Sequence, residues 1–315
     1  MKQYAALCCY FGQWPNYFQF WLKSCSYNTD IDFFLVSDIS VEGYEMPINV
    51  HIVNMSFADV QDLVKSKFPD ITASVDRPYK LCDYKTAYGY IFSDLFAGYD
   101  YWGFYDIDTI WGNILKFIPE NSDNHLVKIL PCGHLSFVRN MAPYDKIFEL
   151  VNTVAGTPCR NNMQGKTVSV WQQCFSSSDS HYYDEEGGLE PYLTQHPDVP
   201  TFSSVIFDNI LPPWRFDHFL SINFPEKSHF LVYSFSEGML CRHYLNGLKV
   251  QTEEIGYLHV SKRRFSVGTT DTNQFVIYPN RFAAYHGWSL LDILIKGRPR
   301  YLSHLLRRIV NKFLR

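Results

Sequence analysis

The chain has 315 residues, of which 46% are apolar and 17% aromatic, so we expect a filled globular core and exclude a disordered or fibrous protein. The net charge of −4 provides no overall basic field, and no nucleic-acid partner is expected. The eight cysteines are scattered without a CxxC pair, which argues against a disulfide framework or structural zinc and fits reduced thiols in the cytoplasm.

The first 140 residues alternate between strand and helix signals. Apolar runs predict buried strands over 4–11, 32–37, 50–53 and 101–105. Helices are expected from the turn at 14–16 to about Tyr27, from the capping residue Ser56 onward, and over 85–96. This order predicts an α/β fold with a mainly parallel sheet flanked by helices.

The second half of the chain is less regular. Residues from about 155 to 200 read as a long functional loop region that includes the acidic segment 184–188. Short strands of the same domain are expected over 202–207, 229–235 and 255–260. We therefore expect one domain over 1–295 and a tail over 296–315. The N-terminal apolar stretch reads as a core strand rather than a signal peptide, and no apolar run is long enough to span a membrane.

Three acidic residues fall at predicted strand ends, where ligands bind in parallel sheets: Asp38, Asp106 and Asp108. Asp106 and Asp108 are separated by one residue, and like charges this close raise each other's pKa unless a cation compensates them. A divalent ion prefers oxygen ligands and can keep positions open for phosphate oxygens. The alternatives are two solvated loop acids, or Asp108 capping a helix that begins near Thr109.

Several segments together resemble a family of bacterial polysaccharide-biosynthesis glycosyltransferases with the GT-A fold and a DxD motif. The likeness covers most of 1–285, and its segments are RPYKLCDYK (77–85), Gly89, YDYWG (99–103), DID (106–108), GHLSFVRN (133–140), the acidic segment 184–188 and YLHVSKR (257–263). The resemblance implies a Rossmann-type sheet. It also implies transfer of a sugar from a nucleotide-diphosphate sugar to a growing capsule, lipopolysaccharide or exopolysaccharide glycan.

The resemblance also suggests metal ligands. Asp108 would be the firmest ligand, with Asp106 sharing the metal or holding the ribose hydroxyls. GT-A enzymes usually take a further ligand from near the end of the domain, and His259 matches, with His286 as the fallback. An imidazole ligand suits Mn²⁺ better than Mg²⁺. Otherwise His259 is an ordinary strand histidine.

Donor-binding candidates surround these residues in the likeness. Lys262, which is followed by Arg263 and Arg264, could neutralise phosphates. Lys80 could touch the diphosphate and Asp83 the nucleoside, although an ordinary surface ion pair is the alternative. Asp38 could accept a hydrogen bond from uracil or ribose, which favours a UDP-sugar, or could be a simple turn residue.

The acidic segment contains the candidates for a general base. An inverting transferase needs a carboxylate to take the proton of the acceptor hydroxyl, and Asp184 and Glu185 stand beside two glycines that allow approach. An ordinary exposed loop is the alternative, and a retaining enzyme would not need this base.

The tail over 296–315 differs from the rest of the chain because it is basic and carries no acid. Its apolar residues follow helical spacing along one face: Leu302, Leu305, Leu306, Ile309, Val310 and Phe313. Such an amphipathic helix can lie on an anionic membrane, which predicts a peripheral protein on the inner face of the cytoplasmic membrane. A transferase that acts on a lipid-linked glycan would gain from this docking. Packing on the domain or on a second subunit is the alternative.

Two other functions fit parts of the pattern. A metal-dependent nucleotidyl- or phosphotransferase would also use metal-bound carboxylates, but the sequence has no glycine-rich phosphate loop. A non-catalytic carbohydrate-binding protein could use the 22 tyrosines and 7 tryptophans as stacking platforms, but it would not need a strand-end acid pair.

Overall fold

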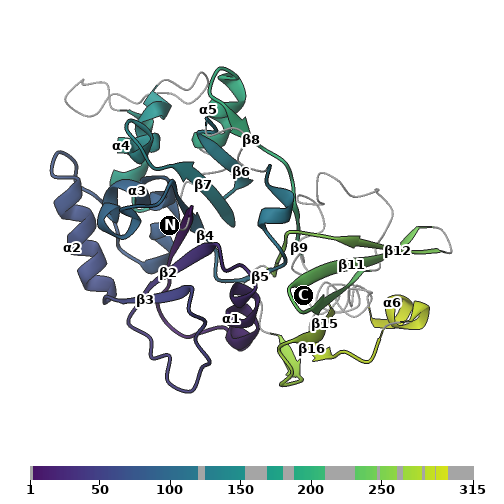
Figure 1. Cartoon of the computed structure of the whole chain (residues 1–315). Coiled ribbons are helices and arrows are strands. Elements are labelled where there is room, and N and C mark those ends of the chain that lie inside the picture. Colours follow the sequence, from purple (N-terminus) through teal and green to yellow (C-terminus); the bar gives the residue numbers. More distant parts are fainter. Residues whose placement is uncertain are drawn as a thin grey trace, which may run out of the picture.

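The computed structural model describes residues 3–119, 125–152, 169–179, 188–209, 231–246, 249–260, 265–278, 281–287 and 289–296. These residues form a mixed α/β structure with three sheets, shown in Figure 1. In Figure 1 the first sheet and its helices lie on the left, and the second sheet lies on the right.

The first sheet has seven strands in the order β3-β2-β1-β4-β7-β6-β8. The four strands from β3 to β4 are mutually parallel, and β7 runs antiparallel to both β4 and β6. The strands are β1 (Tyr4–Cys9), β2 (Ile31–Ser37), β3 (Val50–Asn54), β4 (Tyr101–Tyr105), β6 (Lys128–Cys132), β7 (Leu135–Arg139) and β8 (Thr201–Phe202). Because β1, β2, β3 and β4 are parallel, the residues that follow them share one edge of the sheet.

Alternate side chains of this sheet fill two cores. Trp102 and Phe104 point to the face covered by α2, α3 and α4, whereas Tyr101 and Tyr105 point to the face covered by α1. The helices of the described chain are α1 (Phe18–Ser26), α2 (Phe57–Lys67), α3 (Tyr88–Ile91), α4 (Val170–Ser176), α5 (Leu189–Gln195) and α6 (Leu290–Lys296). The 3-10 segments are η1 (Pro78–Ala87), η2 (Ser93–Phe96), η3 (Leu115–Phe117) and η4 (Tyr144–Asn152).

The second sheet has the order β12-β11-β10-β15-β16-β14 and is antiparallel except at β14–β16. Its strands are β10 (Leu231–Ser236), β11 (Met239–Asn246), β12 (Lys249–Glu254), β14 (Ser266–Gly268), β15 (Gln274–Tyr278) and β16 (Arg281–Ala284). Helix α1 lies between the two sheets. Phe18 and Trp21 of this helix pack in the core of the first sheet, while Phe20 packs with Phe275 and Phe282 of the second.

A small third sheet joins the two larger ones. It contains β5 (Thr109–Trp111), β13 (Tyr257–His259) and β9 (Phe207–Asn209), with β13 in the centre. Strand β5 follows β4 almost directly, so β13 is brought beside the residues that end β4. This arrangement determines the geometry of the candidate site.

Several predicted elements are confirmed. The strands before residue 110 agree within about two residues, and α2 begins after Ser56 with a capping box formed by Ser56 and Asp59. The predicted helix over 85–96 is wrong, because this part of the chain is divided among η1, α3 and η2. Gly89 of α3 lets the helix backbone approach β4 closely, since an added Cβ would lie 2.3 Å from the Trp102 ring.

The predicted strands of the second half do not belong to one sheet. The expected strands at 202–207, 229–235 and 255–260 fall into three different sheets, and the antiparallel second sheet was not expected. Among the described residues, no helix combines the length and apolar character needed to cross a bilayer. Apart from Lys296, which ends α6, the predicted tail helix lies outside the described residues.

Candidate metal centre

The connection from β4 to β5 holds Asp106 and Asp108. The backbone N–H of Asp106 donates to the carbonyl of His134 over 3.1 Å, and the hydroxyl of Thr109 donates to the carbonyl of Asp106 over 2.8 Å. These bonds fix the turn after β4. The Asp106 side chain is 21% exposed, whereas that of Asp108 is 3% exposed. Asp108 is therefore a nearly buried carboxylate, and Asp106 is partly buried.

Strand pairing brings His259 to these acids. Strand β13 pairs antiparallel with β5 so that His259 lies opposite Thr109, and the N–H of Val260 donates to the carbonyl of Asp108 over 2.8 Å. The His259 Nε2 atom then lies 3.4 Å from Asp108 Oδ1. One ligand atom from each of Asp106, Asp108 and His259 can be chosen so that all three lie within 4.8 Å of one another. The structure thus brings together the three residues predicted as metal ligands.

This group fits a divalent cation. Ligands about 2.0–2.2 Å from one ion lie roughly 3 Å apart in adjacent positions and just over 4 Å apart in opposite positions. The 3.4 Å separation between His259 Nε2 and Asp108 Oδ1 suits adjacent ligands after a small rotation. Two carboxylates and one imidazole suit an ion of the Mn²⁺ type, and three protein ligands leave other positions open.

Lys85 contributes a positive charge to the same place. Its ammonium group donates to Asp106 Oδ1 over 2.9 Å and to the Gly133 carbonyl over 2.8 Å, and its side chain is 7% exposed. Lys85, Asp106 and Asp108 together carry a formal charge of +1 − 1 − 1 = −1. The protein itself therefore compensates one of the two carboxylates, which the acid pair alone does not predict. Lys85 ends the segment 77–85 of the resemblance, but no role for it is expected from the sequence.

His134 is the second residue that the sequence did not identify as part of the site. Its ring stacks on His259 with centroids 4.2 Å apart and 21° between the planes, and its Nδ1 lies 3.4 Å from the Tyr257 hydroxyl. Burial holds the pKa of His134 well below its usual value, and His259 and Lys85 lower this pKa further. The neutral ring of His134 therefore supports the ring of His259. The sequence signal that could have identified His134 is its place in the segment 133–140, which is part of the resemblance.

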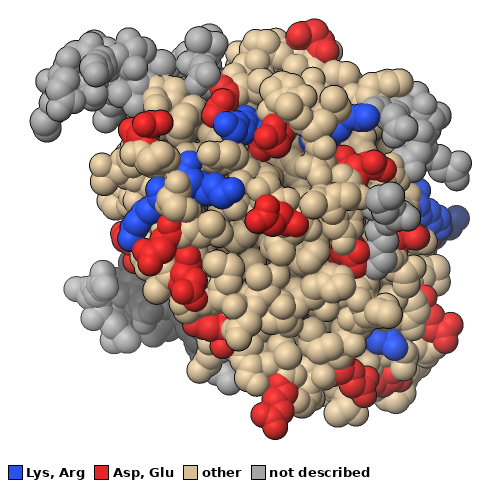
Figure 2. Space-filling model, turned by 60° about the vertical axis from the view of Figure 1, so that its left-hand side comes forward, with Lys and Arg blue, Asp and Glu red and all other residues tan. Residues whose placement is uncertain are grey.

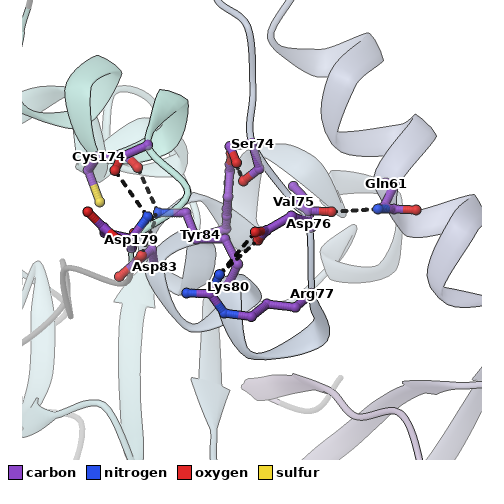
Figure 3. Close-up of polar contacts among 11 residues, drawn as sticks. Gln61, Ser74, Val75, Asp76, Arg77, Lys80, Asp83, Tyr84, Cys174 and Asp179 are labelled. Carbon is purple, nitrogen blue, oxygen red and sulfur yellow. Dashed lines mark hydrogen bonds and ion pairs between the residues drawn. The ribbon is translucent and has the colours of Figure 1, made fainter.

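Lys80 and Asp83 form a buried ion pair, drawn in Figure 3. The Lys80 ammonium donates to Asp83 Oδ2 over 2.7 Å, to the Cys174 carbonyl over 2.8 Å and to the Asp179 carbonyl over 2.6 Å. Both side chains of the pair are completely buried, which excludes the alternative of an ordinary surface ion pair. These contacts join η1 to the chain around α4, and the roles of both residues in donor binding stay predictions.

Of the remaining candidates, two are described but lie apart from the three-residue group, and three fall outside the described residues. Asp38 is exposed directly after β2, and β1 separates β2 from β4, so its backbone is about 10 Å from the end of β4. His286 is exposed after β16 and does not belong to the three-residue group. Asp184, Glu185 and Lys262 lie outside the described residues.

An aromatic pair follows β1 at the same edge of the sheet. Tyr10 stacks on Trp14 with ring centroids 5.6 Å apart, and the Trp14 indole donates to the Ser40 carbonyl over 2.8 Å. Partial burial raises the pKa of Tyr10, and the charge of Asp108 raises it further. Because β1 lies between β2 and β4, Tyr10 stands between the positions of Asp38 and Asp106.

Comparison with known proteins gives a family but no activity. No curated protein matches the chain. A family model described as "Family of unknown function (DUF6625)" matches residues 6–286, which include the whole three-residue group, the second sheet, and the first sheet except for the first two residues of β1. The chain therefore belongs to this family of unknown function, DUF6625.

Proposed function

We propose that this protein is a metal-dependent glycosyltransferase that uses a nucleotide-diphosphate sugar. The observation that carries the proposal is the meeting of Asp106, Asp108 and His259, which come from a strand end and from a strand about 150 residues later. Two carboxylates and one imidazole at the carboxyl end of a mainly parallel sheet are suited to binding a cation together with a phosphate ligand.

The arrangement of the first sheet supports a GT-A-like fold, as the resemblance implies. Four parallel strands place Asp38, Tyr10 and Asp106 along one edge in the order of strands β2, β1 and β4. A nucleotide could then extend along this edge, with its diphosphate at the acid pair and its base near the Tyr10 ring. Asp38 is in a position to accept hydrogen bonds from the base or ribose.

Each described residue has a distinct task in this proposal. Asp108 and His259 would hold Mn²⁺ or Mg²⁺, and Asp106 would share the ion while it remains bonded to Lys85. A bound divalent ion would supply Lewis-acid stabilisation of the leaving nucleoside diphosphate. Lys85 would balance the charge of the Asp106 carboxylate, and His134 would orient the His259 ring. Asp184 and Glu185 remain the candidates for the base that deprotonates the acceptor.

The resemblance implies that the acceptor is a glycan or a lipid-linked glycan of a surface polysaccharide. The alternative of a nucleotidyl- or phosphotransferase would use the same ligands, so substrates and products together distinguish the reactions. Transfer of sugar consumes a nucleotide-sugar and releases a nucleoside diphosphate. Nucleotidyl transfer from a nucleoside triphosphate releases pyrophosphate, and phosphoryl transfer releases a nucleoside diphosphate but consumes a nucleoside triphosphate.

Thermal-shift screening tests the donor site. The full chain is heated with a panel of nucleoside diphosphates and nucleotide-sugars, with and without Mn²⁺. We expect stabilisation by at least one nucleotide only when the metal is present, with uridine nucleotides as the first candidates. If no nucleotide changes the melting temperature with either Mn²⁺ or Mg²⁺, the proposal of a nucleotide-sugar donor site is contradicted. Metal-independent stabilisation by free glycans would favour a carbohydrate-binding protein instead.

A further inference from the structure

Lys85 places a positive charge in a fixed position beside the acids of the candidate metal centre. It lies near the end of η1, and its ammonium group donates to Asp106 Oδ1 over 2.9 Å and to the Gly133 carbonyl over 2.8 Å. The side chain is nearly buried, and its Nζ lies 6.0 Å from the centre of the Phe104 ring. The charge is therefore held between the end of β4 and the turn that follows β6.

A lysine in this position is unfavourable for a site that binds a cation alone. Because Lys85, Asp106 and Asp108 carry −1 together, a divalent ion meets one net negative charge, whereas the two acids alone would offer two. One unit of charge a few ångströms away changes an affinity substantially even at an effective dielectric constant of about 20. A centre built for the cation alone would bind it more tightly with an uncharged residue at position 85.

The same charge favours an anion that binds next to the cation. A divalent ion changes the formal charge of the centre, counted over Lys85, the two acids and the ion, from −1 to +1. Without the lysine charge the change would be from −2 to 0, and the anion would meet no net attraction. A diphosphate, which carries several negative charges at neutral pH, is the kind of anion that gains most.

The surrounding charges of the described structure make this local charge important. Lys80, the preceding lysine of η1, is buried against Asp83, as Figure 3 shows, and this pair adds no net charge. The chain as a whole carries −4. On the face shown in Figure 2, acidic and basic side chains of the described residues are interspersed and do not gather into a broad basic patch. Attraction of an anion to the centre therefore depends on charges as close as that of Lys85.

We propose that Lys85 makes the centre bind a divalent cation together with a diphosphate in preference to the cation alone. The inference rests on the proposed function for the identity of the diphosphate, which is that of the nucleotide-sugar. Lys85 weakens binding of the bare ion and strengthens binding of the diphosphate once the ion is present. It thereby limits occupation of the centre by metal ions when no nucleotide is bound.

Two titrations of the full chain test this role. Electron paramagnetic resonance follows binding of Mn²⁺ without nucleotide, and calorimetry follows binding of UDP or inorganic pyrophosphate at saturating Mn²⁺. In Lys85→Met we expect Mn²⁺ to bind on the order of tenfold more tightly and both diphosphates on the order of tenfold more weakly. A merely structural role of Lys85 would weaken all of these affinities, so shifts of opposite sign identify its charge as the cause.

Two further variants complete the test. Lys85→Gln removes the charge but keeps a hydrogen-bond donor, so it should show the same opposite shifts and replaces Lys85→Met if that variant does not fold. Lys116→Met removes a lysine paired with Glu254 and should leave the affinities unchanged.

The possible results separate this inference from the proposed function. Weaker binding of Mn²⁺ and the diphosphates alike, or unchanged binding of the diphosphates, in the Lys85 variants would overturn the role of Lys85 even if UDP binds the unchanged chain. Failure of pyrophosphate to bind the unchanged chain with Mn²⁺ would also overturn it. If pyrophosphate shows the expected shifts but no nucleotide or nucleotide-sugar binds, the role of Lys85 is supported and the proposed function is contradicted.

Discussion

The imidazole rings of His134 and His259 are stacked, with centroids 4.2 Å apart and planes 21° from parallel. The same residue, His134, accepts the backbone N–H of Asp106 through its carbonyl over 3.1 Å. The turn between β6 and β7 therefore contacts both sides of the candidate metal centre, the acid side through its backbone and the histidine side through its ring.

Replacing His134 should weaken metal binding although its ring is not a proposed ligand. His134→Ala removes the ring that stacks on His259, so the orientation of the His259 ring is held less firmly. Because loss of groups that orient metal ligands costs roughly 10–100-fold in affinity, we expect a loss in this range. Titration with Mn²⁺ followed by electron paramagnetic resonance measures it. His134→Phe keeps an aromatic ring and should recover most of the affinity; equal affinities of all three proteins would contradict the positioning role.

Lys85 should oppose metal binding while it stabilises the metal-free protein. Lys85→Met leaves Asp106 uncompensated, so the melting temperature without metal should fall. Removing a positive charge beside the ion should also strengthen Mn²⁺ binding by on the order of tenfold. The rise in melting temperature on adding Mn²⁺ should therefore be larger in the variant.

The control for Lys85 is Lys116→Met, which removes a more exposed lysine paired with Glu254. Its response to Mn²⁺ should equal that of the unchanged protein. A smaller rise for Lys85→Met than for the unchanged protein would show that Lys85 is needed to build the site rather than to balance its charge.

The Lys80–Asp83 pair should contribute strongly to stability. Lys80→Met leaves a completely buried carboxylate without its ammonium partner, and removing one member of a buried pair costs about 3–5 kcal/mol. Urea unfolding measures the loss, and Lys80→Met/Asp83→Leu should recover part of it. The exposed pair of Lys65 and Asp62 offers a control, because Lys65→Met should cost less than about 1 kcal/mol. Similar losses of unfolding free energy in Lys80→Met and Lys65→Met would show that the Lys80–Asp83 pair is not buried.

His243 should make the stability of the second sheet depend on pH. Its ring is bonded to the Ser234 and Thr252 hydroxyls, and burial lowers its pKa from 6.5 to about 4. The unfolded chain therefore binds a proton that the folded chain does not between pH 6.5 and about 4, so stability falls as the pH falls through this window. The full effect is roughly 3 kcal/mol at most.

Urea unfolding at pH 7 and pH 4.5 measures this dependence. His243→Gln removes the titrating ring, and its stability should change less between the two pH values than that of the unchanged protein. An identical pH dependence in both proteins would mean that His243 is already protonated in the folded state.

The parts of the structure that could be predicted from sequence share a physical cause. Strands such as β1 and β4 are buried on both faces, so their apolar runs are continuous and unmistakable, and Asp106 follows one of them directly. The second sheet lacks this signal because β12 reads Lys-Val-Gln-Thr-Glu-Glu and is partly exposed. One local clue was available in the Gly of Glu237-Gly238, because the two-residue turn between β10 and β11 needs positive φ at both positions.

The candidate site was predictable to a similar extent. The acid pair is local in sequence, and the resemblance suggested His259. The roles of Lys85 and His134 depend on tertiary contacts, because η1 and the turn between β6 and β7 meet the acids only after the sheet has formed. No spacing rule links position 134 to position 259, so the stacked pair could not be derived before the structure.

The most direct test of the candidate centre is calorimetric titration of UDP into the full chain, with and without Mn²⁺, in the unchanged protein and in Asp108→Ala. We expect Mn²⁺-dependent binding that is lost in Asp108→Ala and reduced in His259→Ala, with His286→Ala as an unaffected control. UDP binding of equal strength without metal, or in Asp108→Ala with metal, would contradict the assignment of Asp108 as the residue that holds the cation against the diphosphate.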